Sequence, residues 1–140
     1  MNTRNDELGL LLSRTYLSLK RETSRMLQQF ELTPEQFSLV AELDKHDDVT
    51  QKELADVTER EQTTVTKIVD KLVKKGLVNR RHDPHDRRAI RLLITEAGRQ
   101  LVSEIIPKVD EIETNAYQGF HQEDIKTLHT LMRKLHQNLQ

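Results

Sequence analysis

The stretch from Thr50 to Thr95 constrains the fold most, because helical and extended patterns follow one another within it. Thr50 and Glu53 have the spacing of a capping box, which predicts a short helix starting at Thr50. After a tight turn, apolar residues recur at helical spacing from about Gln62 and predict a longer second helix. These residues are Val65, Ile68, Val69, Leu72 and Val73. Gly76 follows a lysine-rich last turn, where helices commonly end, so the two helices predict a helix-turn-helix.

Residues 77–95 predict a two-stranded ribbon with a loop at its tip. The return strand alternates in hydropathy close to period two. Its apolar positions are Ile90, Leu92 and Ile94. Asp83-Pro84 is a turn-forming pair, which places a loop between the strands. Val49 is expected to add one short strand that pairs with this ribbon.

Charge is segregated along the chain, although its total is only −1. Residues 67–91 contain nine Lys and Arg against three Asp and Glu, a local balance of +6 that leaves −7 for the rest. Clustering of one sign is typical of nucleic-acid binding. The alternative is that the lysines form an ordinary solvated helix face, and it is disfavoured because the ribbon repeats the same sign. A helix-turn-helix followed by a basic ribbon predicts a winged helix that binds DNA.

The polar face of the second predicted helix supplies the candidate DNA contacts. Side chains of this length and hydrogen-bonding capacity reach base edges in a major groove. They are Gln62, Thr63, Thr64, Thr66 and Lys67, to which Lys71 adds positive charge. At the tip of the ribbon, turn residues project Arg87 and Arg88 away from the body of the protein. A narrow minor groove is the best partner for a guanidinium in that position.

Amphipathic helices are predicted on both sides of this centre. One covers residues 6–29, and another begins at a capping box, Thr33–Gln36, with proline in its first turn. After the ribbon, Thr95 caps a helix that Pro107 kinks without ending it. Residues 122–139 form the last helix.

The chain is expected to be one domain, residues 1–140, mainly α with a small β-wing. Residues 33–95 form the winged-helix region, and residues 1–30 and 96–140 form dimerisation helices. A long helix with one apolar stripe needs a surface that covers it. Packing the ends of two chains together supplies that surface and makes an obligate two-fold dimer. The alternative is that the two ends pack only on each other within one chain.

Composition excludes several classes of function. The absence of cysteine removes disulfides, thiol redox sensing and cysteine-ligated zinc. No apolar run approaches a membrane span and the N-terminus has no signal-peptide core, so a soluble, cytoplasmic protein is expected. No phosphate loop, activated nucleophile or metal motif is present, so neither an enzyme nor a cofactor is expected. The pairs His82/His85 and His129/His136 are spaced as ligands could be, but neighbouring Arg and Lys repel a cation, so no metal site is expected.

Four segments resemble the MarR family of bacterial transcriptional regulators. They are residues 32–37 (LTPEQF), residues 50–55 (TQKELA), residues 72–78 (LVKKGLV), and residues 83–88 (DPHDRR) taken with 93–98 (LITEAG). The last segment is the most specific, because it is similar to the wing signature of the family. The order and spacing of the elements match along essentially the whole chain.

The resemblance implies a homodimeric winged helix whose recognition helix enters the major groove of double-stranded DNA. By position, it implies base or near-base contacts for Thr63, Thr64 and Lys67. It also implies that Arg88 enters the minor groove and that Asp86 holds the wing in shape.

The same resemblance implies a repressor that binds a pseudo-palindromic operator and is released by a small aromatic or phenolic effector. The redox branch of the family is excluded, because its reactive N-terminal cysteine is absent. The remaining alternative is a winged helix used for protein contact. It predicts exposed apolar residues on the second helix, and the polar residues found there disfavour it.

Overall fold

The computed structural model describes residues 7–140, so the helix start expected at Asp6 lies outside the described residues. The chain divides into two compact units, Met1–Lys108 and Val109–Gln140. The expectation that residues 1–140 form a single domain remains a prediction.

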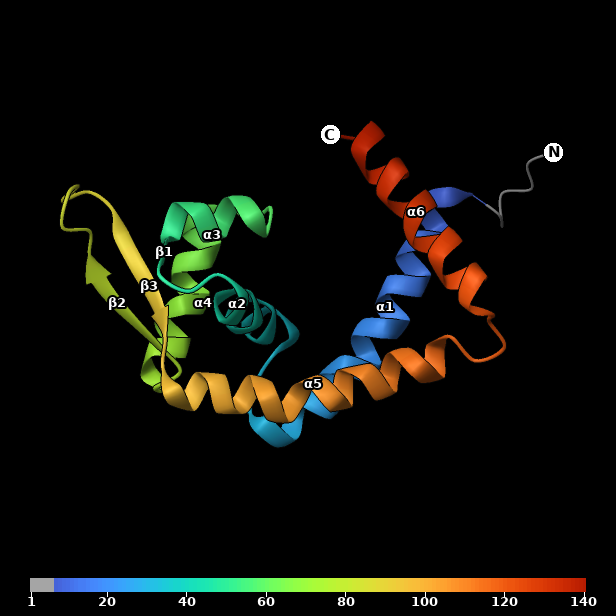
Figure 1. Ribbon diagram of the computed structural model, residues 1–140, viewed down its shortest axis with the longest axis horizontal. Coiled ribbons are helices and arrows are strands. Elements are labelled where there is room, and N and C mark those ends of the chain that lie inside the picture. The colour runs from blue at the N-terminus through green and yellow to red at the C-terminus, as the bar shows by residue number, and fades with distance from the viewer. Residues whose placement is uncertain (1–6) are drawn as a thin grey trace. The chain divides into compact units, whose positions relative to one another are not determined.

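The first unit contains most of the helices and a three-stranded sheet (Figure 1). In chain order its elements are α1 (Leu8–Leu27), the 3-10 helix η2 (Gln28–Phe30), α2 (Pro34–Lys45), β1 (Val49–Thr50), α3 (Gln51–Val57), α4 (Gln62–Lys74), β2 (Val78–His82) and β3 (Ile90–Ile94). Helix α5 (Glu96–Ala116) crosses from the first unit into the second, which also contains α6 (Gln122–Asn138). This is the mainly α fold with a small β-wing that the sequence predicts.

Both predicted capping boxes are present. At the start of α2, the Gln36 N–H donates to the Thr33 hydroxyl at 3.1 Å and the Thr33 N–H donates to the Gln36 side chain at 3.2 Å. At the start of α3, Thr50 and Glu53 exchange the same two bonds at 3.0 and 3.3 Å. Each box satisfies two backbone donors that the first turn of a helix leaves free.

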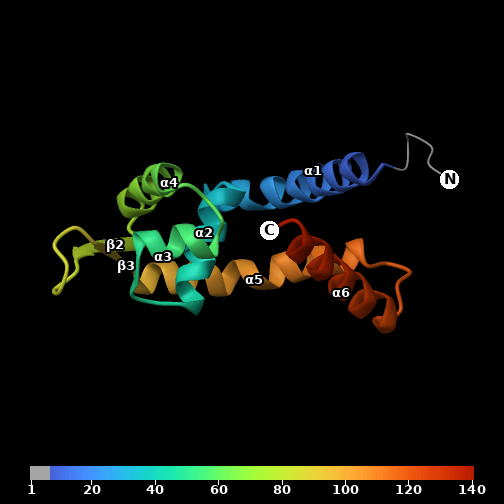
Figure 2. The same ribbon diagram turned by 90° about the horizontal axis from the view of Figure 1, so that it is seen from above.

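The sheet is antiparallel with strand order β1-β3-β2. Val78 pairs with Ile94 and His82 pairs with Ile90, which makes β2 and β3 a hairpin. Val49 pairs with Leu92, so the predicted short third strand is confirmed. The hairpin and its tip extend beyond α3 and α4 in both views (Figures 1 and 2), as expected of a wing.

The core of the first unit lies among α2, α4, the sheet and the early turns of α5. Its fully buried side chains include Leu39, Leu43, Val65, Val69, Leu72, Leu92, Val102 and Ile105. Burying one aliphatic side chain of this size stabilises the fold by about 1.5–3 kcal/mol relative to exposure. The three that belong to α4 are Val65, Val69 and Leu72. They lie on one face of the helix, so the opposite face is left to solvent.

The second unit consists of the end of α5, a turn and α6. Pro107 lies inside α5, which continues to Ala116 as predicted. The turn contains Gly119 in the left-handed region, at a φ of 87°. Asp124 accepts a hydrogen bond from the His121 N–H at 2.8 Å, which secures the start of α6. No helix in residues 7–140 has the length and apolar character needed to cross a membrane.

Candidate nucleic-acid interface

The exposed face of α4 presents a row of polar and basic side chains. Thr63, Lys67, Lys71 and Lys74 follow one another at intervals of four, four and three residues and are all exposed. Such intervals place side chains on one face of a helix. Gln62 and Thr64 are also exposed in the first turn. The helix therefore offers hydrogen-bonding groups at its N-terminal end and positive charge along its length.

Thr66 differs from the other candidates on this helix because it is half-buried. Its hydroxyl donates to the Gln62 carbonyl at 2.8 Å and accepts from the Gln51 side-chain amide at 2.6 Å. These bonds join α3 to α4. The DNA contact expected for Thr66 remains a prediction, and the contacts seen are internal ones.

The residue that meets Thr66, Gln51, was not singled out from the sequence. Its amide nitrogen faces the Thr66 hydroxyl, while its side-chain oxygen is buried without a hydrogen-bond partner among the described residues. Because the Thr66 hydroxyl already donates to Gln62, turning the amide over would lose a bond. The two residues are 15 positions apart in the sequence, and no local sequence pattern indicates that they are in contact.

Arg80 connects β2 to α4. Its guanidinium donates to the Thr66 carbonyl at 3.2 Å and to the Asp70 carboxylate at 2.5 Å. This arginine belongs to the basic segment identified from the sequence. Its charge is matched by Asp70, which is one of the three acids already subtracted in the balance of +6.

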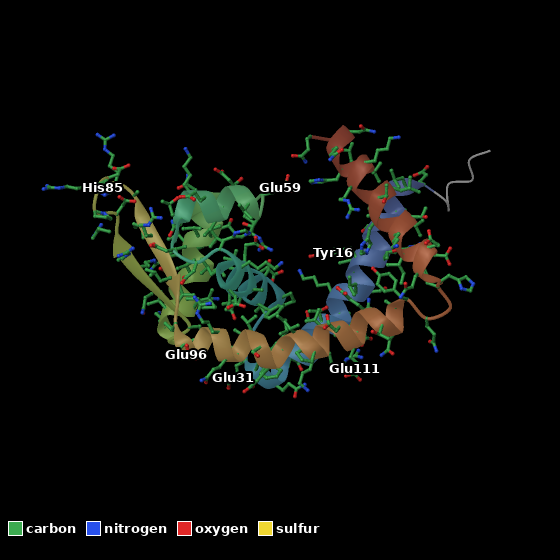
Figure 3. All side chains as sticks on the ribbon, viewed as in Figure 1. Tyr16, Glu31, Glu59, His85, Glu96 and Glu111 are labelled. Atoms are coloured by element: carbon green, nitrogen blue, oxygen red, sulfur yellow. The ribbon has the colours of Figure 1, made fainter. Side chains whose placement is uncertain are left out.

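The wing tip presents two arginines to solvent. Arg87 and Arg88 are exposed, and neither side chain has an ion pair within the part of the chain that the structure describes. Asp86 accepts a hydrogen bond from the Arg88 N–H at 3.0 Å, and its carbonyl accepts from the Ala89 N–H at 3.0 Å. Both contacts lie within the wing tip. The wing-shaping role expected of Asp86 remains a prediction. Figure 3 shows His85 at this tip, beyond the ends of the helices.

A second acid, Asp83, makes more contacts at the tip than Asp86 does. One carboxylate oxygen accepts from the His85 and Asp86 N–H groups at 2.7 and 3.1 Å, and the other accepts from Arg91 at 2.7 Å. Its side chain is only 12% exposed. The backbone donor of His85 and then the Arg91 guanidinium lower the pKa of Asp83. The sequence indicates a turn at Asp83 before proline, but it does not indicate the ion pair of Asp83 with Arg91.

Arg91 lies on the body side of Asp83 and turns inward from β3. Its Nε donates to the Asp48 carboxylate at 2.8 Å, and one terminal nitrogen donates to the Asp48 carbonyl at 2.7 Å. Arg81 donates to the other Asp48 carboxylate oxygen at 2.7 Å. The bond from Arg91 is the main cause of a lowered pKa at Asp48, and the two carboxylates raise the pKa of Arg91.

The arginines of the ribbon therefore fall into two groups. Arg80, Arg81 and Arg91 are bound by aspartates within the protein, whereas Arg87 and Arg88 point to solvent. The sequence places all five in one basic cluster. Asp48, which lies outside that cluster, binds Arg81 and Arg91, whereas Asp70 within it binds Arg80.

A hollow of about 340 Å³ lies between the starts of α3 and α4 and the wing. Lys52, Gln62 and Arg88 line it from three different elements. Lys52 is exposed and was not among the residues expected to contact DNA. Its place beside α4 and the wing adds a further cation to the same surface.

Histidines and acids do not gather into a metal site in residues 7–140: no group of three or more His, Cys, Asp or Glu is arranged to hold an ion. Tyr117 and His129 form a hydrogen bond at 2.7 Å in the second unit. His129 is one of the histidines whose spacing in the sequence could suit a metal, and here it forms a hydrogen bond with a tyrosine.

The helix-turn-helix, the antiparallel wing and the exposed cations on both define a winged-helix protein with a DNA-binding surface. The sequence model of the MarR family matches residues 32–90. The uncharacterized HTH-type transcriptional regulator YdcH of Bacillus subtilis (strain 168) is 33% identical over 113 residues, which are 78% of this chain and 77% of YdcH. The protein belongs to the MarR family, and is a DNA-binding transcriptional regulator rather than an enzyme.

Solved structures agree with this fold. The DNA complex of S. aureus MepR matches with a TM-score of 0.89 and 24% identity, covering 94% of this chain and 98% of that chain. A structure of Bordetella bronchiseptica BpsR matches with a TM-score of 0.88 and 25% identity, covering 96% of each chain. The BpsR structure concerns the mechanism by which 6-hydroxynicotinic acid regulates the DNA binding of BpsR.

Proposed function

We propose that the protein is a repressor that binds a pseudo-palindromic operator as a homodimer and is released by a small aromatic or phenolic ligand. The observation that supports this most directly is the continuous exposed row of Thr63, Lys67 and Lys71 on α4. A helix with this polar face fits a major groove, where its first turns meet base edges.

Each part of the surface has its own role in this proposal. Thr63, Thr64 and Lys67 contact bases or the adjoining backbone, and Lys71 contacts phosphate. Arg88 enters the minor groove beside the recognition helix, because its guanidinium has no internal partner among the described residues. Negative potential is strongest in narrow minor grooves, and A·T-rich tracts narrow the groove most.

Dimerisation is proposed from the apolar residues that the helices outside the winged helix leave exposed. On α1 these are Leu8, Leu10, Leu11, Leu17 and Leu19, and on α6 they are Leu128, Leu131 and Met132. Such an extent of exposed apolar surface marks a protein interface. A two-fold dimer presents two recognition helices to DNA, which accounts for the two half-sites of a palindrome.

Control by a ligand is proposed from the family and from BpsR. The DNA binding of BpsR is regulated by 6-hydroxynicotinic acid. A small aromatic anion of that kind is the class of effector proposed for this protein. A regulator that acts on chromosomal operators works in the cytoplasm, which is the proposed location.

The experiment that tests the function is selection of bound fragments from random double-stranded DNA by the purified protein. We expect enrichment of an inverted repeat with half-sites separated by about one helical turn. The matched control is the double variant Lys67→Ala and Arg88→Ala, which should enrich no such sequence. Equal recovery of all fragments by the native protein would contradict the proposal.

A further inference from the structure

A chain of ion pairs joins the tip of the wing to the loop before β1, in addition to the link from Arg80 to α4. Asp48 lies just before β1, Arg91 lies on β3, and Asp83 lies at the start of the wing tip. Arg91 binds both acids, with bonds of 2.7–2.8 Å to each. Its side chain is 24% exposed, so these bonds are partly shielded from water.

The guanidinium of Arg91 is held at three of its donor positions. Nε and one terminal nitrogen bind the carboxylate and carbonyl of Asp48, while the other terminal nitrogen binds Asp83. The planar fork of arginine fixes direction as well as distance when several of its donors are engaged. Lysine has a single rotatable charge and could not replace it equivalently.

Asp48 adopts a backbone conformation that suits this role. Its φ is 58°, in the left-handed region that side-chain-bearing residues adopt at a cost. Asp and Asn tolerate that region better than most residues. In this conformation the carboxylate and the carbonyl of the same residue both meet Arg91.

From Asp83 the chain of contacts continues to Arg88. Asp83 binds the N–H groups of His85 and Asp86, and Asp86 in turn binds the N–H of Arg88. The exposed arginine at the tip is therefore connected to the body by consecutive hydrogen bonds. Arg88 itself takes no part in the ion pairs.

We infer that Asp48, Arg91 and Asp83 form a wing tether, whose function is to position Arg88 for the minor groove. They are positioning residues that act through Arg88 and do not touch DNA themselves. This inference rests on the proposed function, in which Arg88 recognises the narrow groove of A·T-rich flanks. Without the tether the wing tip samples many orientations. Insertion of Arg88 into the groove must then order the tip, and this ordering weakens binding.

The test measures operator affinity on two DNAs that differ only in their flanks, A·T-rich or G·C-rich. Arg91→Gln should weaken binding about tenfold on A·T-rich flanks and by less than about twofold on G·C-rich flanks. The matched control is Lys20→Gln, which removes a cation and an ion pair of 2.8 Å with Glu35 away from the wing. It should leave the preference between flanks unchanged.

A double-mutant cycle separates positioning from direct contact. In the Arg88→Ala background, Arg91→Gln should change the affinity for A·T-rich flanks by less than about twofold, because its effect acts through Arg88. Full additivity of the two substitutions would overturn the tether.

Asp48→Gly tests whether the acid only stabilises the fold. Glycine relieves the strain of the positive φ but removes the carboxylate, so the unfolding midpoint should be retained while flank preference is lost. If the native protein prefers A·T-rich flanks and both Asp48→Gly and Arg91→Gln keep that preference, the tether is overturned but the minor-groove role of Arg88 is not. A native protein that is indifferent to flanks would overturn both the tether and the minor-groove role of Arg88.

Discussion

Gly98 of α5 lies against the backbone of Leu77, so close that a Cβ at position 98 would be 2.5 Å from the Leu77 carbonyl oxygen. The same carbonyl accepts a hydrogen bond from the Thr95 N–H at 3.0 Å. Thr95 also caps α5, since its hydroxyl accepts from the Gly98 N–H at 3.0 Å, as the sequence predicts. The first turn of α5 is thereby fixed to the beginning of β2.

Gly98→Ala should destabilise the protein by about 1–3 kcal/mol, the cost of overpacking a filled site. The added methyl would also lie 2.7 Å from Cγ1 of Ile94, so neither a backbone nor a core atom can give way freely. Gly9→Ala is the control, because a Cβ there has no neighbour within 4 Å. Thermal unfolding should show a lower midpoint for the first variant and an equal or higher one for the second.

Lys67→Ala should reduce operator affinity by roughly 1–3 kcal/mol and change the preferred bases, because Lys67 lies in the second turn of the exposed face of α4. Binding assays on the operator and on random DNA measure both effects. Lys74→Ala, near the C-terminal end of the same face, serves as the comparison. An equal loss on the two DNAs would make Lys67 a phosphate contact.

Operator affinity should fall steeply with salt, because bound lysines and arginines displace counterions from DNA. Lys71→Ala should reduce the slope of log affinity against log salt by about 1, the change expected for one phosphate contact. Lys126→Ala on α6 should leave the slope unchanged. If native affinity barely differed between low and physiological salt, the electrostatic account of this surface would fail.

Removal of residues 123–140 should give an aggregated or unfolded product that does not bind the operator, because it deletes the apolar residues of α6. Leu131→Glu is a milder test, since this side chain is 58% exposed and its replacement leaves the core intact. Sedimentation should show a shift from dimer to monomer for this variant but not for the neighbouring Lys134→Glu. A folded monomer that binds the full palindrome with native affinity would contradict the dimer.

Acid should weaken the wing, with a sign set by the lowered pKa values of Asp48 and Asp83. A carboxylate whose pKa is lower in the folded state stabilises it above the ordinary value of 3.8, and this contribution is lost as pH falls through the lowered pKa. The difference in unfolding midpoint between native protein and Asp83→Asn should therefore be largest near neutral pH and shrink below 3.8. A difference that is constant with pH would contradict this account.

The sequence predicted those parts of the fold that depend on neighbours along the chain. The boxes at Thr33 and Thr50, the apolar stripe of α4 and the alternation in β3 are local patterns, and each appears where it was expected. Burial is harder to assign within α2, where the larger Phe37 is only half-buried whereas Leu39 is fully buried. A periodic pattern gives the face of a helix, but tertiary packing decides which residue lies at its centre.

The roles of the charged residues could not be predicted in the same way. Asp48 and Arg91 are 43 residues apart, and nothing in either neighbourhood marks them as partners. Counting charge along the sequence grouped Arg91 with the other arginines of the basic segment, although it binds two acids. Conversely, Lys52 precedes the cluster in sequence but lines the same hollow as Arg88.

The uneven distribution of charge also affects how the protein first meets DNA. Residues 67–91 have a balance of +6 in a chain of total −1. The phosphate backbone attracts this surface and repels acidic surfaces elsewhere, so the electric field turns the molecule as it approaches. Encounters that begin in nearly the bound orientation need less rotational search, and the association rate rises for that reason.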